Sequence, residues 1–393
     1  MPMNHFPNIS SSTPKIFVAG GDGPYKNTAL LLQQIDLSFA RGKQVLLKPN
    51  IGRAAEPDTG IVTNYMVVAA AIDAFQKAGA KVAVGESPIV GVDIEEAFKK
   101  SGISRIAKKR GCRLIDLDER SAVKVPVKNG IALKSLKICR DVLESDIIVS
   151  IPVMKMHMHT GVTLSIKNMK GCLWKKSKVK LHMLPPVEGY DEKPIDIAIS
   201  DLAGILKPHF SIIDGTVGME GLGPSAGTPK PMDVLVAGFD PFAADAVACR
   251  LMGTNAEDIP HLRLGAKRGF GIIDIDKISI TPENWTKRAA LFSPPPKNLA
   301  FEFPGINIYD KKSCSACQST LLLLLKKYHG EIINALPRNR QINMVIGKGN
   351  TDIPLDSLCI GNCTAIHKNS KIFVQGCPPV GSEILKAILQ LKK

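Results

Sequence analysis

Long apolar segments and an export signal are both missing from this sequence of 393 residues. Apolar runs are short, as at Leu321 to Leu325, and fall far below the ~20 residues that a membrane helix needs. The N-terminal segment lacks a basic flank followed by a long apolar stretch, which argues against a secretory signal. We therefore expect no membrane insertion and a cytoplasmic location.

Compositional bias is also missing, which excludes several classes of protein. Apolar residues make up 45% and charged residues 22% of the chain, as in ordinary globular proteins. A disordered chain, a collagen-like repeat and a disulfide-stapled miniprotein are thereby excluded. Lysine and arginine number 51 against 36 acidic residues, a formal net charge of +15 that should attract anions.

Short β-rich runs alternate with stretches of helical periodicity through the first 250 residues. Strands are predicted at 15–21, 44–50, 81–87, 146–152, 210–216 and 233–240, and helices at 27–39, at 64–78 and after Pro241. Asn64 is a suitable N-cap for the second helix, and Gly79 a suitable stop. This alternation is typical of an α/β fold in which helices cover a mostly parallel sheet.

The proline-rich segment 293–298 predicts a boundary between two domains. We expect an α/β domain at 1–296 and a smaller, cysteine-rich domain at 297–393. The second domain should contain a long helix around 320–328 and a closing helix around 382–391.

Five of the nine cysteines crowd into the last 80 residues. An odd cysteine count without an export signal argues against a disulfide framework and for thiolate chemistry. Four thiolates can hold a zinc ion or an iron–sulfur cluster. The predicted ligands are Cys314, Cys317, Cys363 and Cys377.

The spacing of these cysteines favours a 4Fe–4S cluster over zinc. Only Cys314 and Cys317 form a C-x-x-C pair, whereas zinc sites often use two such pairs. Cys377 directly precedes proline, as in cluster-binding ferredoxin motifs. Cys359 lies in an apolar run and is expected to pack, although it could replace Cys363 as a ligand.

Charged residues follow several of the predicted strands. Lys48, Glu86, Lys155 and Asp214 each lie at or just beyond a strand end. Because the carboxyl ends of parallel strands meet at one edge, where ligands bind, we expect these four side chains to share that edge.

The segment 153–182 is unusually rich in lysine and histidine. Period-2 alternation predicts Lys155, His157 and His159 on one side of an extended stretch, with Lys167 and Lys170 following. Such a cluster predicts a pocket for carboxylate or phosphate. The histidines could instead bind a metal, but no third ligand is evident.

The basic run 175–180 within this segment is predicted to be an ordinary solvated face. Trp174 is its single aromatic neighbour, and no nucleic-acid-binding module is recognisable, which argues against a nucleic-acid partner.

The stretch 214–229 contains five glycines and the carboxylates Asp214 and Glu220. These carboxylates could act as general acid and base or hold a metal. The equally weighted alternative is a structural Ω-loop whose carboxylates bind backbone N–H groups. The glycines match neither the dinucleotide-binding pattern nor the P-loop.

Four segments in sequential order resemble the family catalogued as domain of unknown function 362. They are KPN (48–50), GVTLSIKNMKG (161–171), IIDGTVGMEGLGP (212–224) and AGFDPFAADAVACRLMG (237–253). Members of that family are often described as uncharacterised iron–sulfur proteins, and many carry a ferredoxin-like segment. The cysteines here depart from the compact two-cluster ferredoxin run, which implies a single cluster, and the resemblance supplies no reaction.

The leading hypothesis is a cytoplasmic iron–sulfur redox protein, an oxidoreductase in which a 4Fe–4S cluster supports chemistry on an anionic small molecule and an electron-transfer protein is the partner. Predicted catalytic residues are Lys167, Glu220 and Asp214; predicted substrate-binding residues are Lys48, Lys155, His157, His159 and Lys170. One alternative is a non-redox binding or assembly module with a structural metal site. Another is a metal-dependent hydrolase or lyase.

Overall fold

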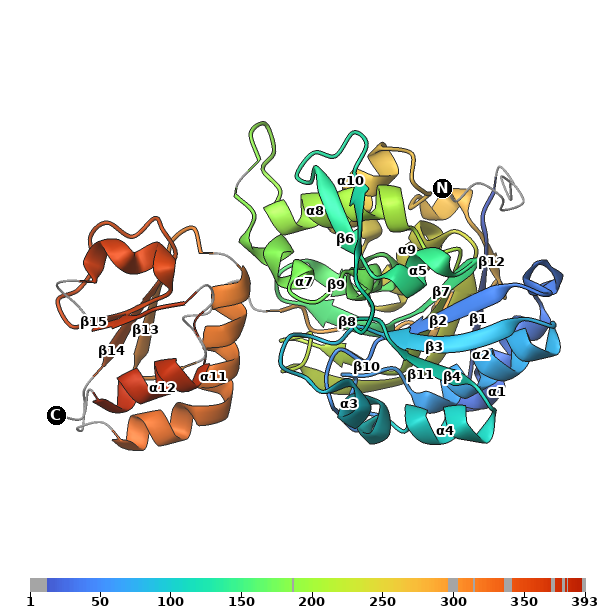
Figure 1. Cartoon of the computed structure of the whole chain (residues 1–393), viewed down its shortest axis with the longest axis horizontal. Coiled ribbons are helices and arrows are strands. Elements are labelled where there is room, and N and C mark those ends of the chain that lie inside the picture. Colours follow the sequence, from blue (N-terminus) through green and yellow to red (C-terminus); the bar gives the residue numbers. More distant parts are fainter. Residues whose placement is uncertain are drawn as a thin grey trace. The chain divides into compact units, whose positions relative to one another are not determined.

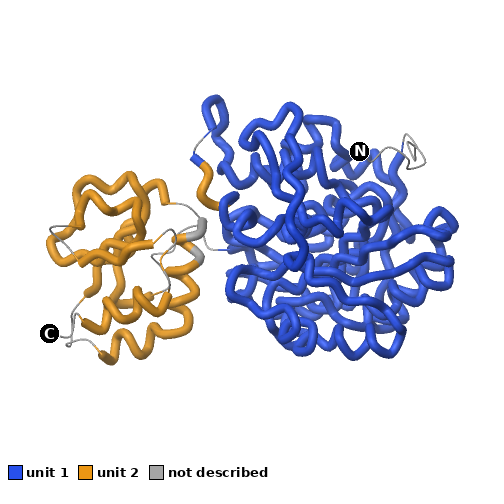
Figure 2. The backbone as a smooth tube through the Cα atoms, in the orientation of Figure 1, with its two compact units in different colours: residues 1–181, 185–295 blue, residues 182–184, 296–393 orange. Residues whose placement is uncertain are grey.

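The computed structural model describes residues 13–185, 187–295, 303–313, 315–335, 341–368, 372–376, 379 and 381–390. The chain divides into two compact units (Figure 2). Unit 1 comprises residues 1–181 and 185–295, and unit 2 comprises residues 182–184 and 296–393. In the described ranges, no helix is both long enough and apolar enough to cross a membrane.

Unit 1 is built on one large, mostly parallel sheet. Its strands are β1 (Lys15–Gly20), β2 (Gln44–Pro49), β3 (Lys81–Glu86), β4 (Arg113–Asp116), β7 (Ile147–Ile151), β8 (Val153–His157), β9 (Gly161–Thr163), β10 (Phe210–Glu220), β11 (Thr228–Gly238) and β12 (Ser279–Thr281). The order is β12-β1-β11-β10-β7-β2-β3-β4, and β8 joins β10. Only β11 and the β8–β9 hairpin introduce antiparallel pairing among the described strands of this sheet. The predicted α/β fold is confirmed.

Helices cover both faces of this sheet (Figure 1). The helices of unit 1 are α1 (Pro24–Gln33), α2 (Tyr65–Lys77), α3 (Ile94–Lys100), α4 (Ile103–Lys109), α5 (Arg140–Glu144), α6 (Ser165–Asn168), α7 (Ser177–Lys180), α8 (Pro194–Leu206), α9 (Pro241–Leu251) and α10 (Pro260–Lys267). Strands β5 (Val123–Pro126) and β6 (Ser135–Ile138) form a separate antiparallel pair. Neighbouring strand residues enter opposite cores: Ile212 packs with the α1–α4 side and Ile213 with the α8–α9 side. This accounts for the continuous apolar strands, because both faces are buried.

Local capping signals position the helices largely as predicted. The Asn64 side chain accepts a hydrogen bond from the N–H of Met66 and caps α2. Pro241 begins α9, and the Asp240 carboxylate accepts from the first free N–H groups of that helix. The helix predicted at 27–39 is shorter because α1 ends at Gln33, and the Asp36 carboxylate then binds Ser38 and starts a new turn.

The predicted glycine-rich loop at 214–229 is largely wrong. Residues up to Glu220 belong to strand β10, and the turn spans only 221–227 before β11 begins. Glycine is needed here for packing, because a β-carbon at Gly215 would lie 2.7 Å from the Val234 carbonyl oxygen, and one at Gly218 would lie 2.9 Å from that of Met154. The glycines therefore permit close strand contacts inside the sheet.

Unit 2 has an α/β arrangement of its own. Four parallel strands lie in the order β13 (Ile306–Asp310), β14 (Ile342–Ile346), β15 (Ser357–Ile360) and β16 (Ile372–Val374). Two helices, α11 (Ser315–Ala335) and α12 (Gly381–Gln390), correspond to the helices predicted around 320–328 and 382–391. The parallel sheet is a finding that the cysteine pattern did not predict.

Candidate functional site

The carboxyl ends of β2, β3 and β7 meet at one edge of the unit 1 sheet. Lys48 is paired with Ser150 in the parallel register, and Glu86 closes the next strand along. The chain leaves β7 through Pro152 and enters β8, which carries Lys155 and pairs with β10. The parallel topology thus gathers charged residues that are more than 100 positions apart in sequence.

Lys48 and Glu86 form a fully buried ion pair at this edge. The Lys48 Nζ atom lies 2.8 Å from each carboxylate oxygen of Glu86, and both side chains are about 1–2% exposed. The Glu86 carboxylate also accepts hydrogen bonds from the N–H groups of Ile51 and Ser87. Buried charges require such complete pairing, since either charge alone would be strongly destabilising.

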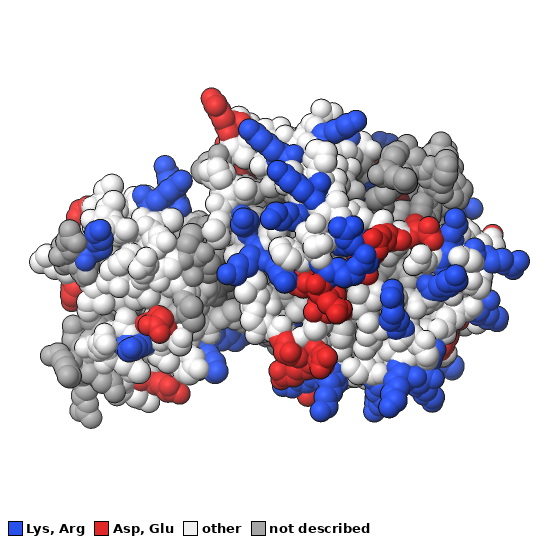
Figure 3. All heavy atoms as spheres, in the orientation of Figure 1, with Lys and Arg blue, Asp and Glu red and all other residues white. Residues whose placement is uncertain are grey.

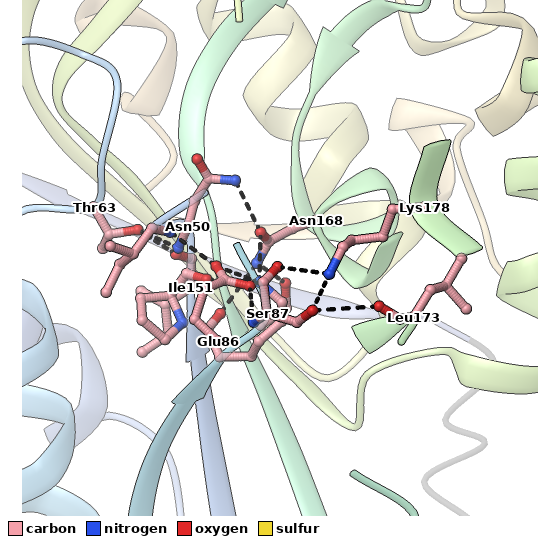
Figure 4. A network of polar contacts seen from close by, with 12 residues as sticks. Asn50, Thr63, Glu86, Ser87, Ile151, Asn168, Leu173 and Lys178 are labelled. Carbon is pink, nitrogen blue, oxygen red and sulfur yellow. Dashed lines mark hydrogen bonds and ion pairs between the residues drawn. The ribbon is translucent and has the colours of Figure 1, made fainter. Parts of the chain in front are cut away.

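Two asparagines connect this pair to Lys155, and Figure 4 shows the contact between them, from Asn50 to Asn168. The Asn168 Oδ1 atom accepts from Lys48 Nζ at 3.3 Å and from Asn50 Nδ2 at 3.1 Å. The Asn50 Oδ1 atom accepts from Lys155 Nζ at 2.8 Å, and Asn168 Nδ2 donates to the Ser150 hydroxyl. Sequence reasoning assigned no role to either amide, although both lie in segments that carry the family resemblance.

Gly171 permits the close packing of the ion pair. A β-carbon at this position would lie 2.6 Å from Lys48 Cε and 2.7 Å from Glu86 Oε1. Any larger residue would have to displace buried charged groups, which gives the glycine of the NMKG sequence a steric role.

Lys155 has no carboxylate within ion-pair distance in the part of unit 1 that the structure describes. Its Nζ atom donates to the carbonyl oxygen of Ile61 at 2.8 Å, in addition to Asn50, and lies 3.5 Å from that of Pro224. Burial, followed by the positive charges of Lys167 and Arg53, lowers the pKa of Lys155 to about 7. Nearby Glu86 opposes this shift without reversing it.

Lys167 is carried by the short helix α6, whose start is held by a buried carboxylate. Asp245 accepts from the N–H of Ser165 at 2.7 Å and from that of Ile166 at 3.0 Å. The Lys167 Nζ atom donates to the Thr163 hydroxyl at 3.1 Å. Burial lowers the pKa of Lys167 to about 7, against an opposing effect of Asp196.

Two further cationic groups belong to the same neighbourhood. Burial, together with Lys167 and Lys178, lowers the pKa of Lys170 well below its usual value. Burial also lowers the pKa of Arg53, a residue that sequence reasoning missed. Among the described residues, no carboxylate lies within ion-pair distance of Lys155, Lys167 or Arg53. We call Lys48, Arg53, Lys155, Lys167 and Lys170, together with Glu86, the lysine cluster.

His157 and His159 lie beside each other as predicted, although β8 ends at His157. Their ring centroids are 5.7 Å apart, and the N–H of His159 donates to His157 Nδ1 at 3.1 Å. Met154 and Met156 pack into the core on either side of Lys155, as the predicted alternation requires, but the strand ends before His159. No group of three metal-ligating side chains occurs in the part of the chain that the structure describes.

Asp214 and Glu220 are occupied by local contacts. The Asp214 carboxylate accepts from the N–H groups of Asn64 at 2.7 Å and Thr216 at 2.9 Å, and burial raises its pKa. Glu220 is ion-paired to Lys230 at 2.9 Å and accepts from the N–H of Ser293. These are structural contacts, and the catalytic roles predicted for the two carboxylates stay predictions.

The basic run 175–180 is only partly a solvated face. Lysines 175, 176 and 180 are exposed, and lysine and arginine side chains gather on the surface near α7 and α8 (Figure 3). Lys178, in contrast, is buried and contacts Asp118 at 3.1 Å and the Ser87 hydroxyl. The expectation of a solvated residue is wrong for Lys178, because a helical turn directs it toward the lysine cluster.

A pocket of about 520 Å³ lies beside the segment that follows Glu86 and Ser87. Its walls come from the segment 88–94, directly after Ser87, and from Trp174 to Ser177, Lys180 and Lys137. The contact between Ser87 and Lys178 joins these same two segments. No residue of the lysine cluster lines this pocket, so it is a separate feature of the surface.

The cysteines of unit 2 are only partly described, since Cys314 and Cys377 lie outside the described residues. A β-carbon at Gly361 would lie 3.2 Å from the Cys317 sulfur. Asn362, which precedes Cys363, exchanges two hydrogen bonds with Gly376, the residue before Cys377. Cys359 is fully buried in β15, whereas Cys363 is exposed.

The cysteines of unit 1 show no sign of reactivity. All four are buried: Cys112, Cys139, Cys172 and Cys249. Burial raises the pKa of each thiol, to about 11 for Cys112 and about 12 for Cys172. Thiols in such apolar surroundings stay protonated and are poor nucleophiles.

Comparison with known proteins gives a family but no activity. A family model described as "Domain of unknown function (DUF362)" matches residues 45–250, just over half of the chain. The thylakoid-associated protein sll1697 of Synechocystis sp. is 27% identical over 230 residues, which cover 58% of this chain and 69% of that protein. The cytoplasmic location and the electron-transfer partner stay predictions.

Two solved structures show distant likeness. The lactate racemase apoprotein of Thermoanaerobacterium thermosaccharolyticum matches with a TM-score of 0.42 and 13% identity over 65% of this chain. A crystal structure of a Thermotoga maritima protein matches with a TM-score of 0.37 and 18% identity over 59% of this chain. This chain spans about 60% of the length of each. Likenesses this distant carry no argument about activity.

Proposed function

Since this chain belongs to the family of the domain of unknown function DUF362, whose description assigns no reaction, we propose a function from the lysine cluster itself. Unit 1 binds a small organic anion with at least two negative charges and acts on it chemically. Unit 2 holds one 4Fe–4S cluster that serves as an electron carrier for a protein partner.

The observation that carries the anion site is an excess of basic side chains over carboxylates: Lys155 and Lys167 are buried, and Arg53 is half-buried. Glu86 compensates Lys48, but Lys155, Lys167 and Arg53 have no carboxylate within ion-pair distance among the described residues. Leaving cations uncompensated in a protein interior is costly, so such a cluster favours a bound anion. Lysine supplies point charges suited to carboxylate or phosphate oxygens.

Anion binding should be visible as stabilisation of unit 1. Inorganic phosphate or citrate, compared with acetate at constant ionic strength, is expected to raise the unfolding midpoint, because a ligand that binds only the folded state stabilises it. Tryptophan fluorescence is a suitable probe, since both tryptophans of the chain, Trp174 and Trp285, lie in unit 1. The double variant K155M/K167M should lose most of the shift.

The matched control is K176M/K180M, which removes two exposed lysines and the same net charge. This variant should retain the stabilisation by phosphate and citrate. If it loses the shift while K155M/K167M keeps it, the anions bind the basic surface and the proposed site is wrong.

The cluster proposal is supported by the neighbourhood of Cys317 and Cys363. The close approach of the Cys317 sulfur to Gly361, and the hydrogen bonds between Asn362 and Gly376, bring together backbone segments that carry or adjoin three predicted ligands. Cys314, Cys317, Cys363 and Cys377 would hold the cluster. With four cysteine ligands its irons have no open position, so it would transfer single electrons.

Anaerobic purification with iron, sulfide and zinc analysis tests this proposal. We expect about four irons and four sulfides per chain, with a visible absorbance that dithionite bleaches. C317S and C377S should lose this iron, whereas C359S should keep it because Cys359 is packed in β15. Normal iron in C317S or C377S would contradict the ligand set. One zinc without sulfide would identify a structural zinc site instead.

A further inference from the structure

We propose that Lys167 is the reacting amine of the anion site and forms an imine with the bound molecule. The substrate class is then an organic anion that also carries a ketone or aldehyde, such as a 2-oxo acid or a ketose phosphate. This inference rests on the proposed anion site, because the neighbouring cations would hold the anionic group while the carbonyl carbon meets Lys167.

The contacts of the lysines distinguish Lys167 from its neighbours. Lys48 and Lys178 are tied to carboxylates, at 2.8 Å and 3.1 Å. Lys155 donates to two strong acceptors and approaches a third, which leaves its nitrogen no free direction. Lys167 has one hydrogen bond among the described residues, to the Thr163 hydroxyl, so its nitrogen can present a lone pair.

The accessibility of Lys167 agrees with a reactive role. Lys167 is 8% exposed, against 1% for Lys48 and 2% for Lys155. Its backbone is rigid, because Asp245 anchors the first N–H groups of α6. A reacting group needs both a fixed position and some approach for the substrate.

The surroundings favour the neutral form of this amine. Burial lowers the pKa of Lys167 to about 7, and the charge of Lys167 in turn lowers the pKa of its neighbours Lys155 and Lys170. Asp196 on α8 opposes the shift of Lys167, but its carboxylate is also engaged by His261 at 3.2 Å. A desolvated lysine next to another cation is one arrangement by which enzymes activate an amine for imine formation.

The chemistry needs no reagent beyond the substrate. The Lys167 lone pair attacks the carbonyl carbon, a C–N bond forms, and the carbonyl oxygen takes up a proton to give a carbinolamine. Loss of the nitrogen proton and of the hydroxyl group as water then leaves the imine. The Thr163 hydroxyl, 3.1 Å from Nζ, is placed to relay the protons.

Reductive trapping tests the assignment directly. The full-length protein is incubated with pyruvate or dihydroxyacetone phosphate and sodium borohydride, then digested and mapped by mass spectrometry. We expect a reduced adduct on the peptide that contains Lys167 and no adduct when the carbonyl compound is left out. K167R keeps the positive charge and should abolish the adduct. K176R, at an exposed site, should leave the yield unchanged.

The outcomes separate this inference from the proposed anion site. If phosphate and citrate still stabilise unit 1 but no adduct forms on Lys167 with either probe, the imine is overturned and the anion site stands. Adducts spread evenly over exposed lysines also overturn it. If no anion stabilises unit 1 through Lys155 and Lys167, the proposed function and the inference fail together.

Discussion

Substitution of Glu86 by glutamine is expected to destabilise unit 1 by about 3–5 kcal/mol, which is the usual cost of removing one charge of a buried ion pair. The variant removes the charge and keeps a side chain of the same shape, but its one carbonyl oxygen can replace only one of the two carboxylate oxygens that accept from the N–H groups of Ile51 and Ser87. Lys48, about 1% exposed, would retain only the Pro49 carbonyl and Asn168 as acceptors.

A double-mutant cycle checks this expectation. Denaturant unfolding followed by tryptophan fluorescence is compared for E86Q, K48M and K48M/E86Q. Removal of both charges should cost less than the sum of the single changes, because K48M removes the orphaned cation that E86Q leaves behind. Additive effects, or a cost of E86Q below about 1 kcal/mol, would show that the two groups are not paired in the folded protein.

Substitution of Lys167 by methionine is expected to stabilise unit 1 near neutral pH in the absence of anions. Methionine has similar length but no charge to desolvate. The pKa of Lys167 is lowered from 10.5 to about 7 in the folded state, so between these values the unfolded chain binds a proton that the folded protein does not. Wild-type stability therefore rises with pH in this window and is lost as pH falls toward 7.

The expected slope is up to about 1.4 kcal/mol per pH unit from this one group. The advantage of K167M over the wild type should thus be largest at about pH 7 and shrink toward about pH 9. Unfolding free energies across this range, with K176M as the surface control, measure it. A constant difference between wild type and K167M would mean that Lys167 titrates normally.

Bound anion should reverse this pattern. A carboxylate or phosphate next to Lys167 favours its protonated form and raises its pKa again. With saturating citrate, wild-type stability should become nearly independent of pH between about 7 and 9, and K167M should lose its advantage. This comparison links the stability measurement to the proposed site.

Much of the fold could be predicted from local sequence. Apolar runs such as 146–152 form strands that are buried on both faces of the sheet. Asn64 and Pro241 mark the starts of α2 and α9. These signals depend on residues that are close in sequence, so they can be recognised without the tertiary structure. The glycines of β10 led to the wrong prediction of a loop, because glycine is used both in loops and where strands pack closely.

The candidate site was only partly predictable for the same reason. Strand ends placed Lys48, Glu86 and Lys155 at one edge, since parallel strands share a direction. The hydrogen bond between Asn50 and Asn168 joins residues 118 positions apart, and no local sequence pattern predicts it.

Residue types alone were enough to indicate an α/β chain of this family with an anion-attracting lysine segment. Tertiary packing alone decided which lysines are neutralised and which are not. Lys178 is paired with Asp118, whereas Lys167 meets a hydroxyl. That distinction is set by atoms about 3 Å apart that belong to separate elements, and at such distances in a buried site the identity of one neighbour controls whether an amine is charged.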